Sequence, residues 1–191
     1  HQSKVFGEDS ARKVVASDFV YSFERILDPE VASPGIWIFD VVDKQNSFIA
    51  LNDSTFQIKL NRVFPAFLGL LTMQYCSVVP KEAIAYHGEN FRRKPVGTGP
   101  FLFKYWKEGE KLIFLKNPNY FEKNKAGEQM PHLDAVSISF ISDKQSEFME
   151  FMKGELDFLS GVHAAYKDEL LTRDGKLNPK YKGIFKMETS P

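Results

Sequence analysis

The sequence has few of the residues from which disulfides and metal sites are built. Cysteine occurs once, as Cys76, so no disulfide can form within the chain. The four histidines are scattered singly, and the nearest approach to a metal pair, His132 with Asp134, lies in a polar stretch without a third ligand. We therefore expect no metal site, and we expect Cys76, inside an apolar run, to be a buried thiol.

An excess of charge of one sign and long hydrophobic runs are also absent. Lysine plus arginine and aspartate plus glutamate both number 25, a balance that gives no electrostatic attraction for nucleic acid or an acidic membrane. No apolar run is long enough to span a membrane, and no signal segment opens the sequence. The first residues have the composition of a loop, and we expect the chain to be an excised segment of a longer protein.

The common catalytic and nucleotide-binding motifs are missing as well. There is no G-x-S-x-G elbow, no H-E-x-x-H helix and no Walker loop. Gly97-Thr98-Gly99 lacks the third glycine of a dinucleotide site, and it leads into a predicted strand where such a site needs a helix. We therefore expect no enzymatic activity and no cofactor.

What the chain does contain is a high share of aromatic residues. They make up 14% of the sequence, and 18 of them are phenylalanine. Aromatic side chains fill hydrophobic cores, and they also line pockets for apolar or peptide ligands. The composition is therefore that of a folded protein with enough aromatic surface for a binding site.

Apolar residues at helical spacing predict a first helix between residues 14 and 27. The residues that share its buried face are Phe19, Val20, Phe23, Ile26 and Leu27. Ser17 is the expected N-cap, and the negative charge of Asp18 in the first turn interacts favourably with the helix dipole. Asp28-Pro29 is expected to end the helix.

Shorter elements follow this helix. Residues 54–60 alternate between apolar and polar side chains and predict a half-buried strand. Residues 64–74 predict a helix, and residues 82–86 predict a short one. The expected buried face of the longer helix consists of Phe64, Phe67, Leu68, Leu71 and Met73.

The stretch 95–121 organises the middle of the chain. Gly97 and Gly99 can adopt positive φ, which suits a tight turn. Residues 101–106 and 111–116, joined by a short loop that contains glycine, predict a β-hairpin. Both strands carry apolar side chains on both faces, so we expect the hairpin to be covered on both sides.

The last third of the chain predicts alternating strands and helices. The expected elements are a strand over 133–141, a helix capped by the box Ser142-Asp143-Lys144-Gln145 and ended by Gly154, a strand over 155–158, a helix over 163–171 and a strand over 183–187. The fold class predicted for the whole chain is α/β, with a mixed sheet.

Several motifs in this order resemble one family. They are G-T-G-P-F at 97–101, N-P-N-Y-F at 117–121, and a first helix in which Ala16, Asp18, Tyr21 and Ser22 match T-A-x-D-V-x-Y-S. This pattern resembles the extracytoplasmic solute-binding proteins of family 5, the oligopeptide- and dipeptide-binding proteins of bacterial ABC importers. The threonine of the helix motif is Val15 here, which is why the cap is expected at Ser17.

The resemblance implies a fold and a domain division. It implies part of a periplasmic-binding-protein type II fold, with residues 1–96 as a segment of the smaller lobe and residues 97–191 as part of the first lobe. It also implies that Gly97, Thr98, Gly99 and Pro100 form the hinge between these lobes.

The resemblance also points to ligand contacts. In the family, an aromatic residue that follows A-S-P lies beside the bound peptide. Here Ala32-Ser33-Pro34 is followed by Gly35, and Trp37 or Phe39 can take the place of the aromatic residue, although a core position for Trp37 remains the alternative. Ser160 is expected just past a strand end near the cleft, where the family often has an aromatic residue.

The function implied is that of the substrate-binding component of an ABC transporter. It captures peptides, or a related solute such as a nickel complex, haem or a sugar, in an interlobe cleft, and it delivers them to a membrane permease in the periplasm or at the cell surface, where the parent can be lipid-anchored. A C-terminal remainder of the parent chain supplies the other half of the cleft, so we expect weak binding by these 191 residues alone. The alternatives are a ligand-sensing domain of a regulatory protein and an enzyme on a similar sheet.

Overall fold

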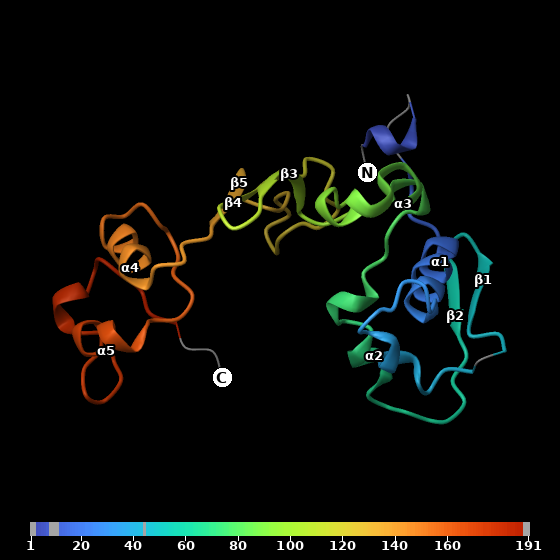
Figure 1. Ribbon diagram of the computed structural model, residues 1–191, viewed down its shortest axis with the longest axis horizontal. Helices are drawn as coiled ribbons and strands as arrows, with labels where there is room; N and C mark the ends of the chain where they lie inside the picture. The colour runs from blue at the N-terminus through green and yellow to red at the C-terminus, as the bar shows by residue number, and fades with distance from the viewer. Residues whose placement is uncertain (1–2, 8–11, 44, 189–191) are drawn as a thin grey trace. The chain divides into compact units, whose positions relative to one another are not determined.

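The first long helix forms where the apolar spacing predicts it. In the computed structural model, which describes residues 3–7, 12–43 and 45–188, α1 spans Ala16–Leu27 (Figure 1). The predicted cap at Ser17 is wrong: the N-cap is Val15, and the carboxylate of Asp18 accepts a hydrogen bond from the Val15 N–H at 2.9 Å. This is the half of a capping box in which the N3 side chain binds the N-cap N–H. Valine has no side-chain acceptor for the reciprocal bond, and the Asp18 N–H donates to the Val15 carbonyl at 2.9 Å.

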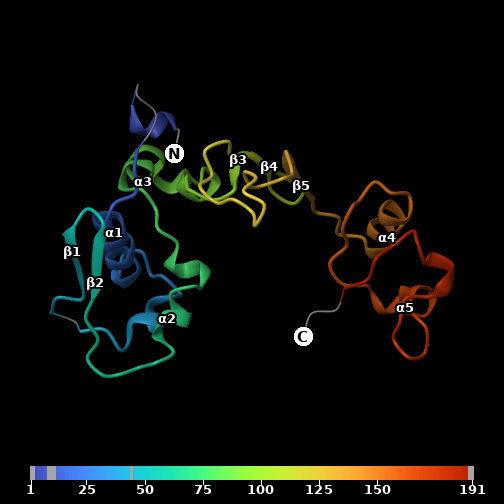
Figure 2. The same ribbon diagram turned by 180° about the vertical axis from the view of Figure 1, so that it is seen from behind.

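The chain divides into two compact units, His1–Ile138 and Ser139–Pro191. The first unit begins with a short 3-10 helix, η1 (Lys4–Phe6), and then α1. Beside α1 lies an antiparallel hairpin of β1 (Phe48–Asn52) and β2 (Thr55–Ile58), and both ribbon views show the two strands along the helix (Figures 1 and 2). The strand predicted over 54–60 is thus confirmed in its central part.

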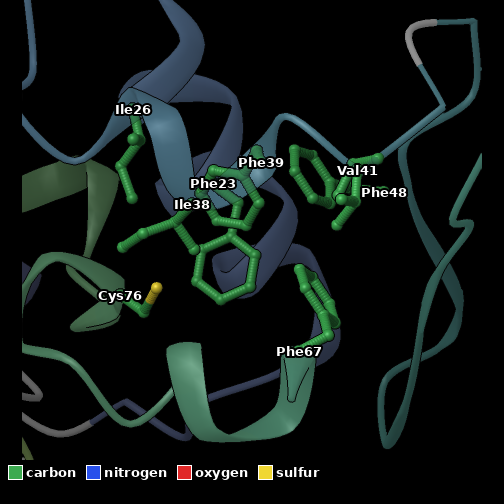
Figure 3. Close-up of a cluster of buried hydrophobic side chains, with 9 residues drawn as sticks. Phe23, Ile26, Ile38, Phe39, Val41, Phe48, Phe67 and Cys76 are labelled. Carbon is green, nitrogen blue, oxygen red and sulfur yellow. The ribbon is translucent and has the colours of Figure 1, made fainter. Parts of the chain in front are cut away.

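A phenylalanine cluster forms the core between α1 and this hairpin. The ring of Phe23 lies 5.1 Å from that of Phe39 and 5.5 Å from that of Phe48, and Phe39 lies 5.2 Å from Phe48. Tilted and edge-to-face contacts of this kind add to the free energy gained by burying the rings. The buried cluster, most of which Figure 3 labels, consists of Phe23, Ile26, Ile38, Phe39, Val41, Val42, Phe48, Phe67 and Cys76. Cys76 is buried as predicted, and burial raises the pKa of its thiol.

The helix predicted over 64–74 is shorter than expected. Only α2 (Phe67–Leu70) is α-helical, and Leu68, predicted to be buried, is 76% exposed. The Thr72 hydroxyl donates to the Gly69 carbonyl at 2.7 Å, and the Met73 N–H donates to the Leu70 carbonyl at 3.1 Å. These short-range bonds end the helix after one turn, and the chain continues into η3 (Gln74–Cys76).

Gly35 lies in close contact with the side chain of Tyr75. It precedes the 3-10 helix η2 (Ile36–Phe39), which places Ile38 and Phe39 in the core. A Cβ atom at position 35 would lie 2.6 Å from the Cβ of Tyr75 and 2.7 Å from its Cγ. No side chain fits in this space without moving Tyr75, so the contact requires glycine.

An ion-pair network joins the N-terminal segment to α1 and α3 (Lys81–His87). The Arg12 guanidinium donates to both carboxylate oxygens of Asp18 and, through Nε, to Glu82 at 2.8 Å. Asp18 is buried, and Arg12 lowers the pKa of its carboxyl group despite the opposing effect of burial. Ser22 adds a link, because its hydroxyl accepts from the Val79 N–H at 2.9 Å. These contacts fix α1 relative to the chain that enters α3.

The predicted hairpin of the middle stretch is confirmed. After η4 (Gly88–Arg93), β3 (Phe101–Lys107) pairs with β4 (Lys111–Lys116) in antiparallel register, and Gly109 takes a φ of 73° in the turn. The strand order is β3-β4-β5, with β5 at Ala135–Ser139. The predicted cover on both faces is wrong for the described residues, since no side chain of these three strands is buried.

The second unit has its own small core. α4 (Lys144–Met152) and α5 (Ala164–Leu170) are the predicted helices, and with η5 (Pro179–Tyr181) they bury Phe148, Leu170 and Tyr181. The cap of α4 is Asp143 in place of the predicted Ser142: its carboxylate accepts from the Ser146 N–H at 2.7 Å. The strands predicted over 155–158 and 183–187 are absent from the described residues, because this unit offers them no neighbouring strand with which to pair.

The space around Gly35 gives a first prediction. Gly35→Ala should lower the free energy of unfolding by about 1 to 3 kcal/mol, because the added methyl group overpacks against Tyr75. Urea unfolding of the chain measures this change. Gly69→Ala is the matched control: nothing lies within 4 Å of its Cβ position, so alanine in α2 should be neutral or stabilising by up to about 1 kcal/mol. Equal effects of the two substitutions would contradict the close contact.

The buried carboxylate gives a second prediction, about pH. Asp18 has a lowered pKa in the folded chain, so its stabilising contribution is complete above the unfolded value of about 3.9 and is lost as the pH falls through the folded pKa. Asp18→Asn should cost about 1 to 3 kcal/mol at pH 7 and progressively less below pH 4. Glu150→Gln, which removes an exposed pair with Lys153, should change stability by less than about 1 kcal/mol. A cost for Asp18→Asn that is the same at pH 7 and pH 3 would refute the electrostatic role.

Candidate functional site

The predicted ligand-contact segment forms a turn that divides its side chains between surface and core. The Ser33 hydroxyl accepts from the Gly35 N–H at 3.2 Å, and η2 follows. Trp37 is 46% exposed, and its neighbour Ile36 is exposed to the same extent. Phe39 is 4% exposed and packs against Phe23 and Phe48. The structure therefore places Trp37, and not Phe39, where a ligand can touch it.

Tyr75 is a residue of this region that sequence reasoning missed. Its side chain lies against Gly35, in the space where an aromatic residue at position 35 would begin. Positions 35 and 75 are 40 residues apart, so no local pattern announces the contact. The exposed apolar pair Ile36 and Trp37, beside the Gly35–Tyr75 contact, is the candidate ligand-contact surface of the first unit.

Ser160, the other predicted ligand contact, lies in the second unit. It is exposed, and it precedes Gly161, which has a φ of 79°. Of the predicted contacts, Gly35 and Trp37 lie in the first unit and Ser160 lies in the second. A role for each of them in ligand binding stays a prediction.

The predicted hinge, Gly97 to Pro100, is held by a buried amide. The Asn117 side chain donates to the Gly99 carbonyl at 2.8 Å, and the Asn117 N–H donates to the Pro100 carbonyl at 2.9 Å. The Asn117 side-chain oxygen also accepts from the Asn119 N–H at 3.0 Å. The G-T-G-P and N-P-N-Y motifs are therefore joined by one buried residue, Asn117, which lies 18 residues after Gly99.

The physical reason predicted for the two glycines is wrong. Neither Gly97 nor Gly99 has positive φ, and among the described residues no atom lies within 4 Å of the Cβ position of either one. The turn also lies inside the first unit, and an exposed ion pair bridges it, since Arg92 and Arg93 both bind Glu108 at 3.0 Å. The role of this turn as an interlobe hinge stays a prediction.

A cavity of about 860 Å³ opens between the N-terminal segment, α1 and this turn. Its lining includes the aromatic residues Phe6, Phe19 and Phe121, and Gly97 and Asn119 also line it. Arg12 and Asp18, paired with each other, lie at the same cavity. The lining is largely apolar, and besides the Arg12–Asp18 pair it holds one further charged side chain, that of Lys13. This lining suits an apolar or main-chain occupant better than an ion.

The described part of the chain contains neither a cluster of metal ligands nor a membrane-spanning helix. Within it, no three histidine, cysteine, aspartate or glutamate side chains gather closely enough to hold a metal ion. No helix in the same residues is long and apolar enough to cross a membrane. The candidate site therefore consists of an exposed aromatic surface and an apolar cavity.

Comparison with known proteins identifies the family. The family model described as bacterial extracellular solute-binding proteins, family 5 middle, matches residues 9–188. The periplasmic oligopeptide-binding protein OppA of Salmonella typhimurium is 29% identical over 160 residues, which cover 75% of this chain and 28% of that protein. Heme-binding protein A of Haemophilus influenzae is 28% identical over 172 residues, covering 83% of this chain and 30% of that one.

A solved structure agrees with the sequence relatives. The periplasmic binding protein DppA of Helicobacter pylori, in complex with the peptide STSA, superposes with a TM-score of 0.71 at 28% identity, covering 89% of this chain and 34% of that one. The chain thus spans about a third of the length of its relatives, and the predicted fold, part of a periplasmic-binding-protein type II fold, is confirmed. The chain belongs to the bacterial extracellular solute-binding proteins of family 5.

Proposed function

We propose that this chain is part of the substrate-binding component of an ABC importer and that its cargo is a peptide. The family consists of solute-binding proteins, and DppA, the structural relative described above, holds a four-residue peptide. In our proposal the parent protein works in the periplasm or at the cell surface and passes its cargo to a membrane permease. It has no enzymatic activity and no nucleic-acid partner.

The observation that carries the proposal is the exposed apolar surface of η2. Trp37 and Ile36 are held at the surface because Ile38 and Phe39 anchor the same turn in the core. A rigid turn presents an indole ring at little cost in conformational entropy, which is how aromatic residues contribute to peptide recognition. In our proposal the indole of Trp37 packs on the cargo peptide, and a ligand contact at Ser160 is a separate prediction.

A cleft between lobes requires more protein than these 191 residues. The relatives are about three times as long, and in our proposal the remaining chain supplies the opposite wall and the charged groups that hold the peptide termini. The parent then closes around its ligand because binding stabilises the closed form. The isolated chain accordingly binds peptide weakly.

The first test is calorimetric titration of the parent protein and of this chain with di- to pentapeptides. Binding by the parent with little or no binding by the chain is the expected result. Titration with haem is a parallel arm, because one relative is a haem-binding protein. Haem binding by a parent that binds no peptide would overturn the assignment of the cargo, and binding of neither would favour a sensor domain or another solute.

Substitution of the indole is the sharper test. Trp37→Ala in the parent should weaken peptide binding about tenfold, which corresponds to about 1.4 kcal/mol. Leu68→Ala is the control, because Leu68 is an exposed apolar residue of the same unit outside η2, 76% exposed against 46% for Trp37, and it should leave the dissociation constant unchanged. If Trp37→Ala and Leu68→Ala bind peptide as tightly as the wild type, Trp37 does not contact the cargo.

A further inference from the structure

Nothing in the described structure requires a glycine at position 97. Gly35 is required by Tyr75, and eight other glycines, among them Gly109 and Gly161, have positive φ. Gly97 has neither property: its φ is not positive, and no atom of the described residues lies within 4 Å of its Cβ position. Glycine also occurs where a second backbone or a ligand packs closely against the main chain. In the absence of that partner, the space next to the glycine is open.

The main chain at Gly97 and Thr98 is also unpaired. In the described part of the chain, no hydrogen bond engages the N–H or C=O group of either residue. The next two carbonyls, of Gly99 and Pro100, are both bound by Asn117. Asn117 therefore fixes one half of the turn and leaves the amide and carbonyl groups of the other half free to bond to an incoming chain.

These free groups lie in the wall of an apolar cavity. Gly97 and Thr98 line the space of about 860 Å³ whose other walls include Phe6, Phe19 and Phe121. Phe121 is 73% exposed. Unpaired main-chain groups beside exposed aromatic rings are what a crossing polypeptide segment needs, because it gains hydrogen bonds and buries apolar surface together.

We propose that a main-chain segment of the parent protein, from the two thirds that has no counterpart in this chain, crosses Gly97 and fills this cavity. The argument rests on the proposed function only in taking the chain as part of a longer binding protein. The relatives contain enough additional chain to provide such a segment, since this chain covers only 28% of OppA and 34% of DppA. The segment bonds to Gly97 and Thr98 and covers Phe121.

The charges of the cavity favour this occupant over a cargo peptide. A free peptide carries a charged group at each end, and burying it requires opposite charges that are available to pair. Arg12 and Asp18 are both at the cavity and are bound to each other, so Lys13 is the one charged side chain of its described lining without an ion pair, and no carboxylate there is available for the amino end of a peptide. An internal segment of the parent has no charged ends to satisfy, so the cavity can accept it with main-chain hydrogen bonds alone.

Amide hydrogen exchange distinguishes the possible occupants. The amides of Gly97 and Thr98 should exchange rapidly in the 191-residue chain and should be protected in the parent, both without peptide and with a tetrapeptide present. Protection that develops only with peptide would make the cavity part of the cargo site and overturn the proposal. Rapid exchange in the parent under both conditions would also overturn it.

A substitution tests the need for glycine independently. Gly97→Val should leave the Tm of the 191-residue chain unchanged and lower the Tm of the parent, because only the parent brings a second backbone to this position. Gly69→Val, at another uncrowded glycine, should behave alike in both proteins. A Tm of the parent that Gly97→Val does not lower would contradict the proposal. If the parent binds no peptide and its Gly97 amide is still protected, the proposed cargo fails and this inference stands.

Discussion

The structure of the first unit depends on the packing of Phe23 of α1 against Phe39 and Phe48, which also contact each other. These rings come from a helix, a 3-10 turn and a strand, so their contact fixes three elements at once. Because η2 is anchored by Ile38 and Phe39, its other two side chains, Ile36 and Trp37, have to face outward. The core therefore determines which aromatic side chain of η2 is exposed, and the candidate ligand-contact surface follows from the packing beneath it.

A second constraint comes from surface that the chain leaves bare. The strands β3 and β4 carry apolar side chains on both faces, yet no side chain of β3, β4 or β5 is buried among the described residues. The cavity beside Gly97 also has a largely apolar lining. Both features suit a chain that spans about a third of the length of its relatives, and exposed apolar surface of this kind favours association with further protein.

Sequence reasoning succeeded where the determinants are local. The helical spacing of Phe19, Phe23 and Ile26 predicted α1, and the paired strands around Gly109 predicted the β3–β4 hairpin. It failed where the local structure depends on contacts with other parts of the chain. The capping of Val15 by Asp18 depends on how the chain enters α1, the contact of Tyr75 with Gly35 joins positions 40 residues apart, and the strands predicted over 155–158 and 183–187 have no partner in their unit. The motifs were enough to identify the family, whereas the exposure of Trp37 and the burial of Phe39 could be read only from the three-dimensional structure.

The central claim is that the surface formed by η2 contacts a peptide in the parent protein. The chain has two tryptophans, Trp37 and Trp106, and their indole N–H groups give separate signals in a nitrogen–proton correlation spectrum. Titration of the isotope-labelled parent with a tetrapeptide should shift the Trp37 signal at saturation. The account predicts a shift at Trp37 that exceeds any shift at Trp106. A saturable shift at Trp106 with an unchanged Trp37 signal would place the peptide elsewhere and contradict it.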